Sequence, residues 1–449
     1  SSLHILAGGS VNIGTAEINA PDVGELDINF LQETVTLSDG TVVEVDGGKQ
    51  PTLDIRAGIA PDALGMPPLE SLTGFDPATD AFFGNAFITD LPLNADIVIG
   101  DVFIAASDGL VLLTNQNQPN TDIEGSIFVT GGGIYGDGID ARGSGSLGSL
   151  VILDSRNNIA INDFVAINSC FSTSCLEDGK GGDIGLIADS EVSLGSFSSL
   201  LTNGGGNIAI QGNRFLMQKF SQISSPTGGL GNGGNITLRV PEEILIDGGN
   251  IGTFNNSFQA SSTGGDIIIE TGRLTAIGAA VFLGAPLPNG FLTGGDITSD
   301  TIGSGDAGNI SITAEEMQLR NGAQIRASTI GDNGTEGNAG DITIRATDIL
   351  KVTGFTPESG DPSKIATSVN PRSVGEGGEL RIETNRLIIE DGAQIQAGIF
   401  GQGQGGSIFI NAEETVEVLD YREDDRPTGI FSGPEGAMAT GNSGDITLT

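Results

Sequence analysis

The chain has 449 residues, 71 of them glycine, and its formal net charge is −39. No Gly-X-Y period is present, which excludes collagen, and the hydrophobic 37% of the chain is gathered in short β-branched runs, which argues against disorder. A surface this acidic repels phosphate backbones, so nucleic acid is not an expected partner, and no apolar run reaches the roughly 18 residues that a membrane-spanning helix needs.

Residues 1–125 differ from the rest of the chain and are predicted to form the first β-helical coils. A Pro- and Phe-rich stretch near 61–93 interrupts them, and we expect either an insertion packed on the side of the coils or a mobile loop. The chain opens at Ser1 without the basic start of a signal peptide and stops at Thr449 inside a strand-like pattern. We therefore expect a segment of a longer chain, with any targeting signal outside it.

The chain contains two cysteines, Cys170 and Cys175, with four residues between them. That spacing suits a disulfide across a tight loop, with two free thiols as the alternative. Two cysteines are too few for a zinc site, and the single histidine, His4, is far away in the sequence.

Residues 126–449 are dominated by one recurring phrase: a small residue, Gly, Asn or Asp, Ile, any residue and an aliphatic residue. Its glycine stands at positions 182, 206, 234, 265, 295, 308, 340 and 444, with looser copies at 125, 148, 378 and 406. Most of the spacings fall between 23 and 38 residues, the range of one solenoid coil. This region is therefore predicted to be a repetitive shaft.

A second marker keeps a fixed distance from that phrase. Ala323, in Asn-Gly-Ala-Gln-Ile, lies 14 residues after Asn309, and Ala393, in Asp-Gly-Ala-Gln-Ile, lies 14 residues after Glu379. A fixed offset means a fixed register, in which each coil contains three strands and a variable loop. The sequence predicts an all-β, right-handed parallel β-helix with roughly ten coils after residue 126.

The chemistry of the phrase suggests its role at a corner of the coil. We expect the Gly to supply a positive φ, the Ile to fill a core layer, and the Asn or Asp to bond the backbone and its neighbours in a ladder. The expected structural ladder consists of Asp183, Asn207, Asn235, Asp266, Asn309, Asp341 and Asp445.

The segments 2–11, 42–47 and 51–58, together with the Gly-Asn-Ile and Gly-Ala-Gln-Ile phrases, resemble large exoproteins of the filamentous-haemagglutinin type, particularly the cyanobacterial ones. The resemblance covers most of the chain. It implies two-partner secretion through an outer-membrane partner, and a β-helical shaft in adhesion or a surface layer. The family's Asn-Pro-Asn-Gly-type signature is missing, and the nearest match, at 287–290, is misplaced. Either the secretion domain precedes Ser1 or the export route differs.

Some right-handed β-helices cleave acidic polysaccharides, so a polysaccharide-active lyase or glycoside hydrolase is the alternative function. Adjacent acids occur at 242–243, 315–316, 413–414 and 424–425. The first three pairs begin six or seven residues after the anchor phrase, so they occupy one repeated turn, whereas a catalytic pair needs a single site. The chain also has no Trp and two Tyr for sugar stacking, although Phe could partly substitute. We therefore assign no catalytic residue and predict a protein that is not an enzyme.

Calcium is the one cofactor that the sequence leaves open. Clustered oxygens on glycine turns occur at Asp137 and Asp140, and again at Asp332, Asn333 and Glu336. Neither cluster has the nonapeptide of calcium-binding β-rolls or the twelve-residue loop of EF-hands, and ordinary turn chemistry explains both better.

We expect an extracellular or cell-surface shaft that has a structural or adhesive role and binds surface or matrix glycans or proteins. No polar cap is visible at either end of the chain, although solenoid ends expose unpaired strand edges. The sequence therefore also predicts end-to-end self-association into a filament or surface layer.

Overall fold

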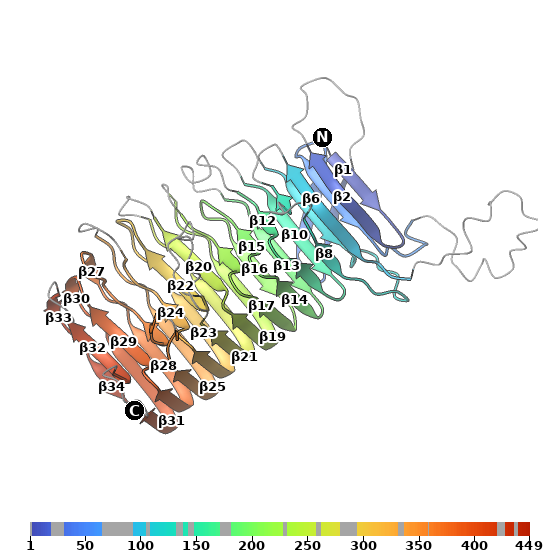
Figure 1. Ribbon diagram of the computed structural model, residues 1–449. Helices are drawn as coiled ribbons and strands as arrows, with labels where there is room; N and C mark the ends of the chain where they lie inside the picture. Colours follow the sequence, from blue (N-terminus) through green and yellow to red (C-terminus); the bar gives the residue numbers. More distant parts are fainter. Residues whose placement is uncertain are drawn as a thin grey trace, which may run out of the picture.

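The structure is a computed structural model. It describes residues 2–18, 31–64, 93–104, 108–131, 138–141, 148–170, 181–227, 231–256, 262–278, 294–330, 336–357, 359–419, 427–434 and 439–449. These residues form strands, turns and loops, and none of them lies in a helix. The strands stack one above another into an elongated shaft, with the N-terminus at one end and the C-terminal coils at the other (Figure 1). The fold is a parallel β-helix with three strands per coil, as the sequence predicts.

Each coil contributes a strand or half of a longer strand to each of three faces, and the strands of a face pair in parallel from one coil to the next. Face 1 contains thirteen strands or strand halves in an unbroken series. Its separate strands are β1 (Ser2–Leu6), β5 (Thr52–Arg56), β7 (Leu110–Thr114), β10 (Leu150–Ser155), β13 (Ile184–Ala188), β16 (Ile208–Gln211) and β34 (Ile446–Leu448).

Face 2 follows face 1 along each coil, and face 3 completes it. The separate strands of face 2 are β8 (Ile127–Val129), β11 (Ile159–Ile161), β14 (Glu191–Leu194) and β17 (Arg214–Met217). Those of face 3 are β9 (Ile139–Asp140), β12 (Ala166–Asn168), β15 (Ser199–Leu201), β18 (Gln222–Ser224), β20 (Asn250–Asn255), β22 (Asp296–Thr301), β24 (Gln324–Arg326), β26 (Lys364–Ala366), β29 (Gln394–Ile399) and β32 (Gly429–Pro434).

Eight longer strands bend and so serve two faces each. Two of them join faces 2 and 3, namely β2 (Val11–Ile18) and β6 (Ile97–Ile104). Six join faces 1 and 2, namely β19 (Ile236–Asp247), β21 (Ile267–Ile277), β23 (Ile310–Arg320), β25 (Ile342–Thr353), β28 (Leu380–Glu390) and β31 (Ile408–Leu419). Four of the five pairings between these six strands shift register at the bend, where residues such as Pro241, which has no backbone N–H, interrupt the ladder. The pairing of β21 with β23 keeps its register.

The core is a column of aliphatic layers inside the coils. On face 1 the aliphatic residues of the anchor phrases stack directly on one another through eight pairings, and all but the terminal one are buried. They are Ile184, Ile208, Ile236, Ile267, Ile310, Ile342, Leu380, Ile408 and Ile446. On face 3, Ile251, Ile297, Ile325, Ile365 and Ile395 form a second column in the same way. Successive side chains of a strand point to opposite sides, so every second residue of these strands enters the core inside the coils.

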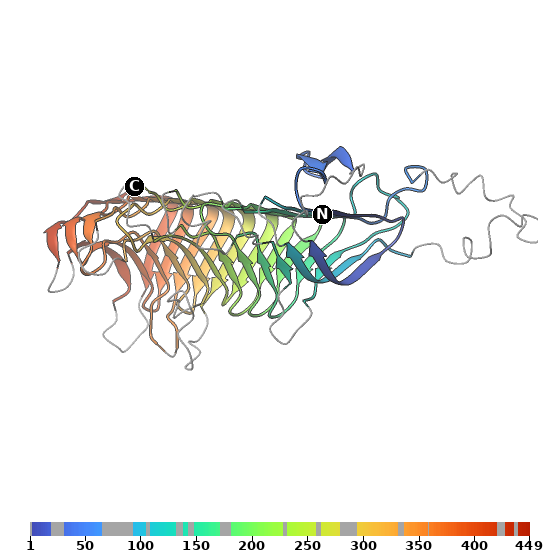
Figure 2. The same ribbon diagram turned by 90° about the horizontal axis from the view of Figure 1, so that it is seen from above.

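An antiparallel hairpin lies on the outside of the shaft near its N-terminal end (Figure 2). It consists of β3 (Gln32–Thr36) and β4 (Val42–Asp46). Val35, Leu37, Val43 and Val45 of this segment pack with residues from the outer side of face 1 in a second, smaller hydrophobic core. Most of the insertion that the sequence predicts near 61–93 lies outside the described residues.

Ion pairs also connect the hairpin to the shaft. Arg56 of β5, only 2% exposed, pairs with Asp54 through two hydrogen bonds of 2.9 and 2.8 Å and with Glu33 of β3. His4 Nδ1 lies 3.1 Å from the same Asp54 carboxylate. A third small parallel sheet, made of β27 (Val374–Glu376), β30 (Gln402–Gln404) and β33 (Thr440–Asn442), follows face 3 near the C-terminal end.

Candidate functional site

The anchor Asn and Asp residues lie in one column at the corner that leads into face 1. The Oδ1 atom of each side chain accepts a hydrogen bond from the backbone N–H of the corresponding residue one coil further on, over 2.7–2.9 Å. The acceptors are Asp183, Asn207, Asn235, Asp266, Asn309 and Asp341. At Asp445 the backbone N–H bonds the Ser407 hydroxyl instead, at 3.3 Å. The ladder therefore joins side chain to backbone, and one contact, Asn207 Nδ2 to Asp183 Oδ1, also joins side chain to side chain.

The anchor glycines have a different role from the one that the sequence suggested. Gly234, Gly308 and Gly340 do not adopt a positive φ. A Cβ on Gly340 would instead lie 2.0 Å from the carbonyl oxygen of Gly308, and one on Gly234 would lie 1.8 Å from that of Gly206. The expectation of a positive φ at this corner is wrong, because the glycine is required for the close approach of successive coils.

Positive φ occurs at the second marker, in the turn between faces 2 and 3. Asn321 and Gly322 have φ values of 57° and 91°, and Asp391 and Gly392 have values of 56° and 85°. Two successive residues with positive φ are typical of a type I′ turn, which favours Asn-Gly and Asp-Gly. One phrase copy also belongs here rather than to the ladder: Gly295 has a φ of 90°, and Asp296 pairs with Asn250 on face 3.

A shallow polar groove of about 520 Å³ runs beside the ladder. A second column supplies its other side, because Asn232, Asp306 and Asn338 each accept a backbone N–H from the next coil at 2.8–3.1 Å. Asp266 and Asp341 of the ladder line the same groove. Since one oxygen of each of these side chains already holds the neighbouring coil, the groove is first of all a structural feature.

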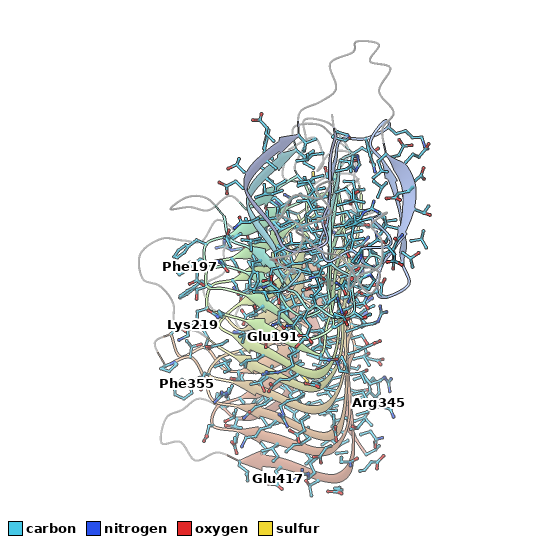
Figure 3. All side chains as sticks on the ribbon, turned by 90° about the vertical axis from the view of Figure 1, so that its right-hand side faces the viewer. Glu191, Phe197, Lys219, Arg345, Phe355 and Glu417 are labelled. Atoms are coloured by element: carbon cyan, nitrogen blue, oxygen red, sulfur yellow. The ribbon has the colours of Figure 1, made fainter. Side chains whose placement is uncertain are left out.

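The acid pairs at 242–243 and 315–316 lie where the long strands bend. The second member of each pair, Glu243 or Glu316, belongs to a row of alternating charges along face 2. The row runs Glu191, Arg214, Glu243, Arg273 and Glu316, and the N–O distances between successive members are 3.6, 3.0, 3.7 and 3.1 Å. Glu191 is labelled on this surface in Figure 3. The pair 413–414 occupies the corresponding position in β31, and 424–425 lies outside the described residues. The described acids of this row therefore form ion pairs between neighbouring coils, which is a structural role.

One cluster of charged groups on the outer side of face 3 is partly buried. Arg326 donates to both oxygens of Asp300, at distances between 2.7 and 3.2 Å, and Asp300 is fully buried. Lys364, two coils beyond Asp296, has its pKa lowered to about 8 by burial and by the neighbouring Arg326, against the opposing effect of Asp296 and Asp300. Carboxylates beside a titratable amine are the groups that the alternative, a polysaccharide-active enzyme, would require.

The other candidate residues are placed as follows. Cys170 is disulfide-bonded, and its only possible partner within this chain is Cys175, which lies outside the described residues. Of the weak calcium candidates, Asp137, Asp332 and Asn333 also lie outside them, Asp140 is buried on β9, and Glu336 is exposed. Within the described ranges, no three His, Cys, Asp or Glu residues come together as a metal site.

Sequence reasoning missed an aromatic stack at the turn between faces 2 and 3. The rings of Phe164 and Phe197 are 4.9 Å apart with an angle of 4° between their planes, and those of Phe197 and Phe220 are 4.9 Å apart with an angle of 24°. All three phenylalanines have a positive φ, at 61°, 59° and 63°. The signal was present in the sequence, because each Phe stands two residues before a face-3 strand in successive coils.

A polar cavity of about 380 Å³ lies beside this stack. Its walls include Asn162 and Asp163 from the turn before Phe164, Ser193 from β14, and Gln218 from the turn before Phe220. Asp163 Oδ1 accepts the backbone N–H of Ser196 at 2.6 Å, which fixes the turn. Figure 3 shows Phe197 and Lys219 projecting from the same edge of the shaft.

Within the part of the chain that the structure describes, no helix is long and apolar enough to cross a membrane. No protein-family model, no curated protein and no solved structure shows significant similarity to this chain.

Proposed function

We propose that this chain is a secreted, cell-surface shaft with a structural or adhesive role. The observation that carries the proposal is the unbroken register of face 1, in which thirteen successive strands pair without interruption. At about 4.8 Å per coil, such a series is nearly 60 Å long. A solenoid of this kind presents an extended surface at a fixed distance from its base.

Two further features support the proposal, and the first of them bears on location. Cys170 is disulfide-bonded, and disulfides persist mainly in oxidising compartments. A net charge of −39 keeps the rods soluble and apart from one another. Membership of the filamentous-haemagglutinin type, with an outer-membrane secretion partner, remains our hypothesis from the sequence phrases.

Both ends of the shaft support a further part of the proposal, end-to-end association. Leu3 and Leu6 of β1 are exposed at the N-terminal end, and Val418, Ile446 and Leu448 are exposed at the C-terminal end. Strands β1 and β34 each pair on one side only among the described strands. An apolar cross-section with open strand edges favours stacking by another β-rich surface, such as a second copy.

Labelling of intact producing cells tests the location. An antibody against residues 126–449 should bind the cells without permeabilisation, and external protease should remove that signal while a cytoplasmic marker survives. Labelling that requires permeabilisation would contradict a surface shaft. Assays for oligosaccharide release from neutral and acidic polysaccharides separate the enzyme alternative, because activity abolished by Asp300→Asn would favour it.

A further inference from the structure

We propose that the stack of Phe164, Phe197 and Phe220, together with the polar cavity beside it, binds a neutral saccharide. The proposal specifies the adhesive role and rests on the proposed function for its biological meaning. The binding itself is a property of the purified chain.

The first argument is the exposure of the rings. Phe164 and Phe197 are 51% and 42% exposed, although packing against the shaft could have buried them. Among the described residues, Phe197 is covered on both ring faces by its neighbours, and Phe164 stacks on Phe197. The stack therefore offers aromatic surface to solvent at Phe164 and Phe197. Contiguous exposed apolar surface of this kind marks interaction sites.

The second argument is the backbone of the three phenylalanines. A bulky residue with a positive φ is a genuine outlier, and the neighbouring coil places Gly248, with a φ of 72°, in this turn. Local strain of this kind is found at functional sites, where the surrounding structure holds it in place. Glycine would satisfy the turn without strain, so what the phenylalanines add at these positions is their rings.

The third argument is the chemistry of the cavity. Asn162, Ser193 and Gln218 supply amide and hydroxyl groups within a few residues of the rings, and Asp163 adds a carboxylate. A sugar ring has an apolar C–H face and a polar edge of hydroxyls, which matches an aromatic ring next to short polar side chains. A protein partner would need roughly 800 Å² of interface, far more than three rings supply.

The charge of the molecule selects among saccharides. A net charge of −39 repels uronate and sulfated glycans at long range, so the ligand is predicted to be uncharged. Among the described residues that line the cavity, Asp163 is the one charged group, and it adds to this selection.

Affinity electrophoresis of the purified chain, residues 1–449, tests the proposal. Native gels would contain laminarin, xyloglucan, hydroxyethylcellulose or, as the acidic polymer, polygalacturonate. At least one neutral polymer should retard the protein and polygalacturonate should not. The double variant Phe164→Ala/Phe197→Ala should bind at least 10-fold more weakly, whereas Phe164→Tyr, which keeps the ring, should bind within about 3-fold. Phe409→Ala removes a phenylalanine on face 1, far from the stack, and should bind normally.

A separate variant distinguishes binding from folding. Phe197→Gly removes a ring and relaxes the backbone, so its melting temperature should equal or exceed that of the wild type while its affinity falls. Retardation by polygalacturonate alone, no retardation by any neutral polymer, or full binding by the double variant would each overturn the proposal. A lower melting temperature for Phe197→Gly would show that the stack serves stability and would also overturn it. None of these results depends on where the protein resides, so they are distinct from a failure of surface labelling.

Discussion

Strands β7 and β25 occupy the same face of the shaft but differ in their outward residues. All five residues of β7 are buried, because its outward Leu110 and Leu112 pack beneath the β3–β4 hairpin. The first half of β25 alternates between buried and exposed residues, and its outward Arg345 pairs with Glu383 of the next coil. Figure 3 shows Arg345 on the free surface. The inward residues follow the repeat, whereas the outward residues depend on what covers the strand.

The two regions also bend at different places. In β2 and β6 the bend separates faces 2 and 3 and lies at Gly14 and Gly100, where a Cβ on Gly100 would lie 2.1 Å from the carbonyl oxygen of Gly14. From β19 to β31 the continuous bend separates faces 1 and 2, and it carries an acidic pair in β19, β23 and β31. The coils therefore keep their parallel pairing although the strand that bends without a break joins faces 2 and 3 in one region and faces 1 and 2 in the other.

The largest effect should come from placing a charge beneath the hairpin. Leu112→Arg should lower the free energy of unfolding by about 4 kcal/mol or more, because the guanidinium would be buried without a partner. Ser311→Arg is the matched control: Ser311 lies in the same row of face 1 but is exposed, and its effect should stay within about 0.5 kcal/mol. Urea unfolding measures both. Similar losses in the two variants would show that the hairpin does not protect this row.

The next effect should come from the ladder corner. Gly340→Ala should destabilise the chain by about 2–4 kcal/mol, because its Cβ has no room beside Gly308. Gly185→Ala, on the outer side of face 1, is the control, since the nearest atom to its Cβ lies 3.9 Å away. A tolerated Gly340→Ala with normal strand content by circular dichroism would contradict the close-approach explanation.

The partly buried amine of Lys364 on face 3 predicts a pH dependence. The pKa of Lys364 is about 8 in the folded chain against 10.5 in a model group, so between these values the unfolded chain binds a proton that the folded chain lacks. The destabilising contribution of the charged amine is therefore complete below pH 8 and disappears as the pH rises to 10.5. Lys364→Gln, which matches Gln324 and Gln394 in the same row, should be more stable than the wild type by about 2 kcal/mol at pH 7.

That advantage should shrink toward zero at pH 10.5, as followed by thermal melts in a pH series. Lys351→Gln provides the comparison, because it removes an amine 2.6 Å from Glu390 and should lower stability instead. A constant advantage for Lys364→Gln at all pH values would contradict a titrating amine at this position.

The smallest effect should come from the exposed charge row on face 2. Arg273→Met leaves Glu243 and Glu316 without one of their partners, but both ion pairs are exposed. Stability should fall slightly at low salt, and the difference should vanish at about 1 M NaCl, where screening is nearly complete. A loss that persists at high salt would indicate a packing role for the arginine stem.

The sequence predicts the inward features of this molecule well. The isoleucine column and the fixed offset of the second marker follow from the repeat, because each coil meets the same neighbours. It could not separate the two uses of glycine, since Gly340 and Gly392 look alike although one permits close approach and the other a positive φ. The placement of the hairpin over β7 is a tertiary contact between residues far apart in the sequence.

The candidate binding site was harder to predict than the fold. Phe164, Phe197 and Phe220 stand at the same place in turns of equal length, but the coils that carry them differ in length, so the three rings align only once the strand boundaries are known. The partly buried cluster of Asp300, Arg326 and Lys364 was hidden for the same reason, because each residue comes from a different coil. The phrase at Gly295 and Asp296 was counted with the anchor phrases because it is locally identical to them, although it lies on face 3.

The ladder has an evolutionary consequence. Each hydrogen bond of the ladder requires from the next coil only a backbone N–H at the corner and a glycine next to it. The acceptor oxygen can come from Asn, Asp or Ser. A duplicated or deleted coil would therefore meet compatible neighbours on both sides without compensating changes elsewhere. Length is then a trait that recombination between repeats can tune in steps of about 4.8 Å. The length of such a shaft can therefore change more quickly in evolution than the shape of its cross-section.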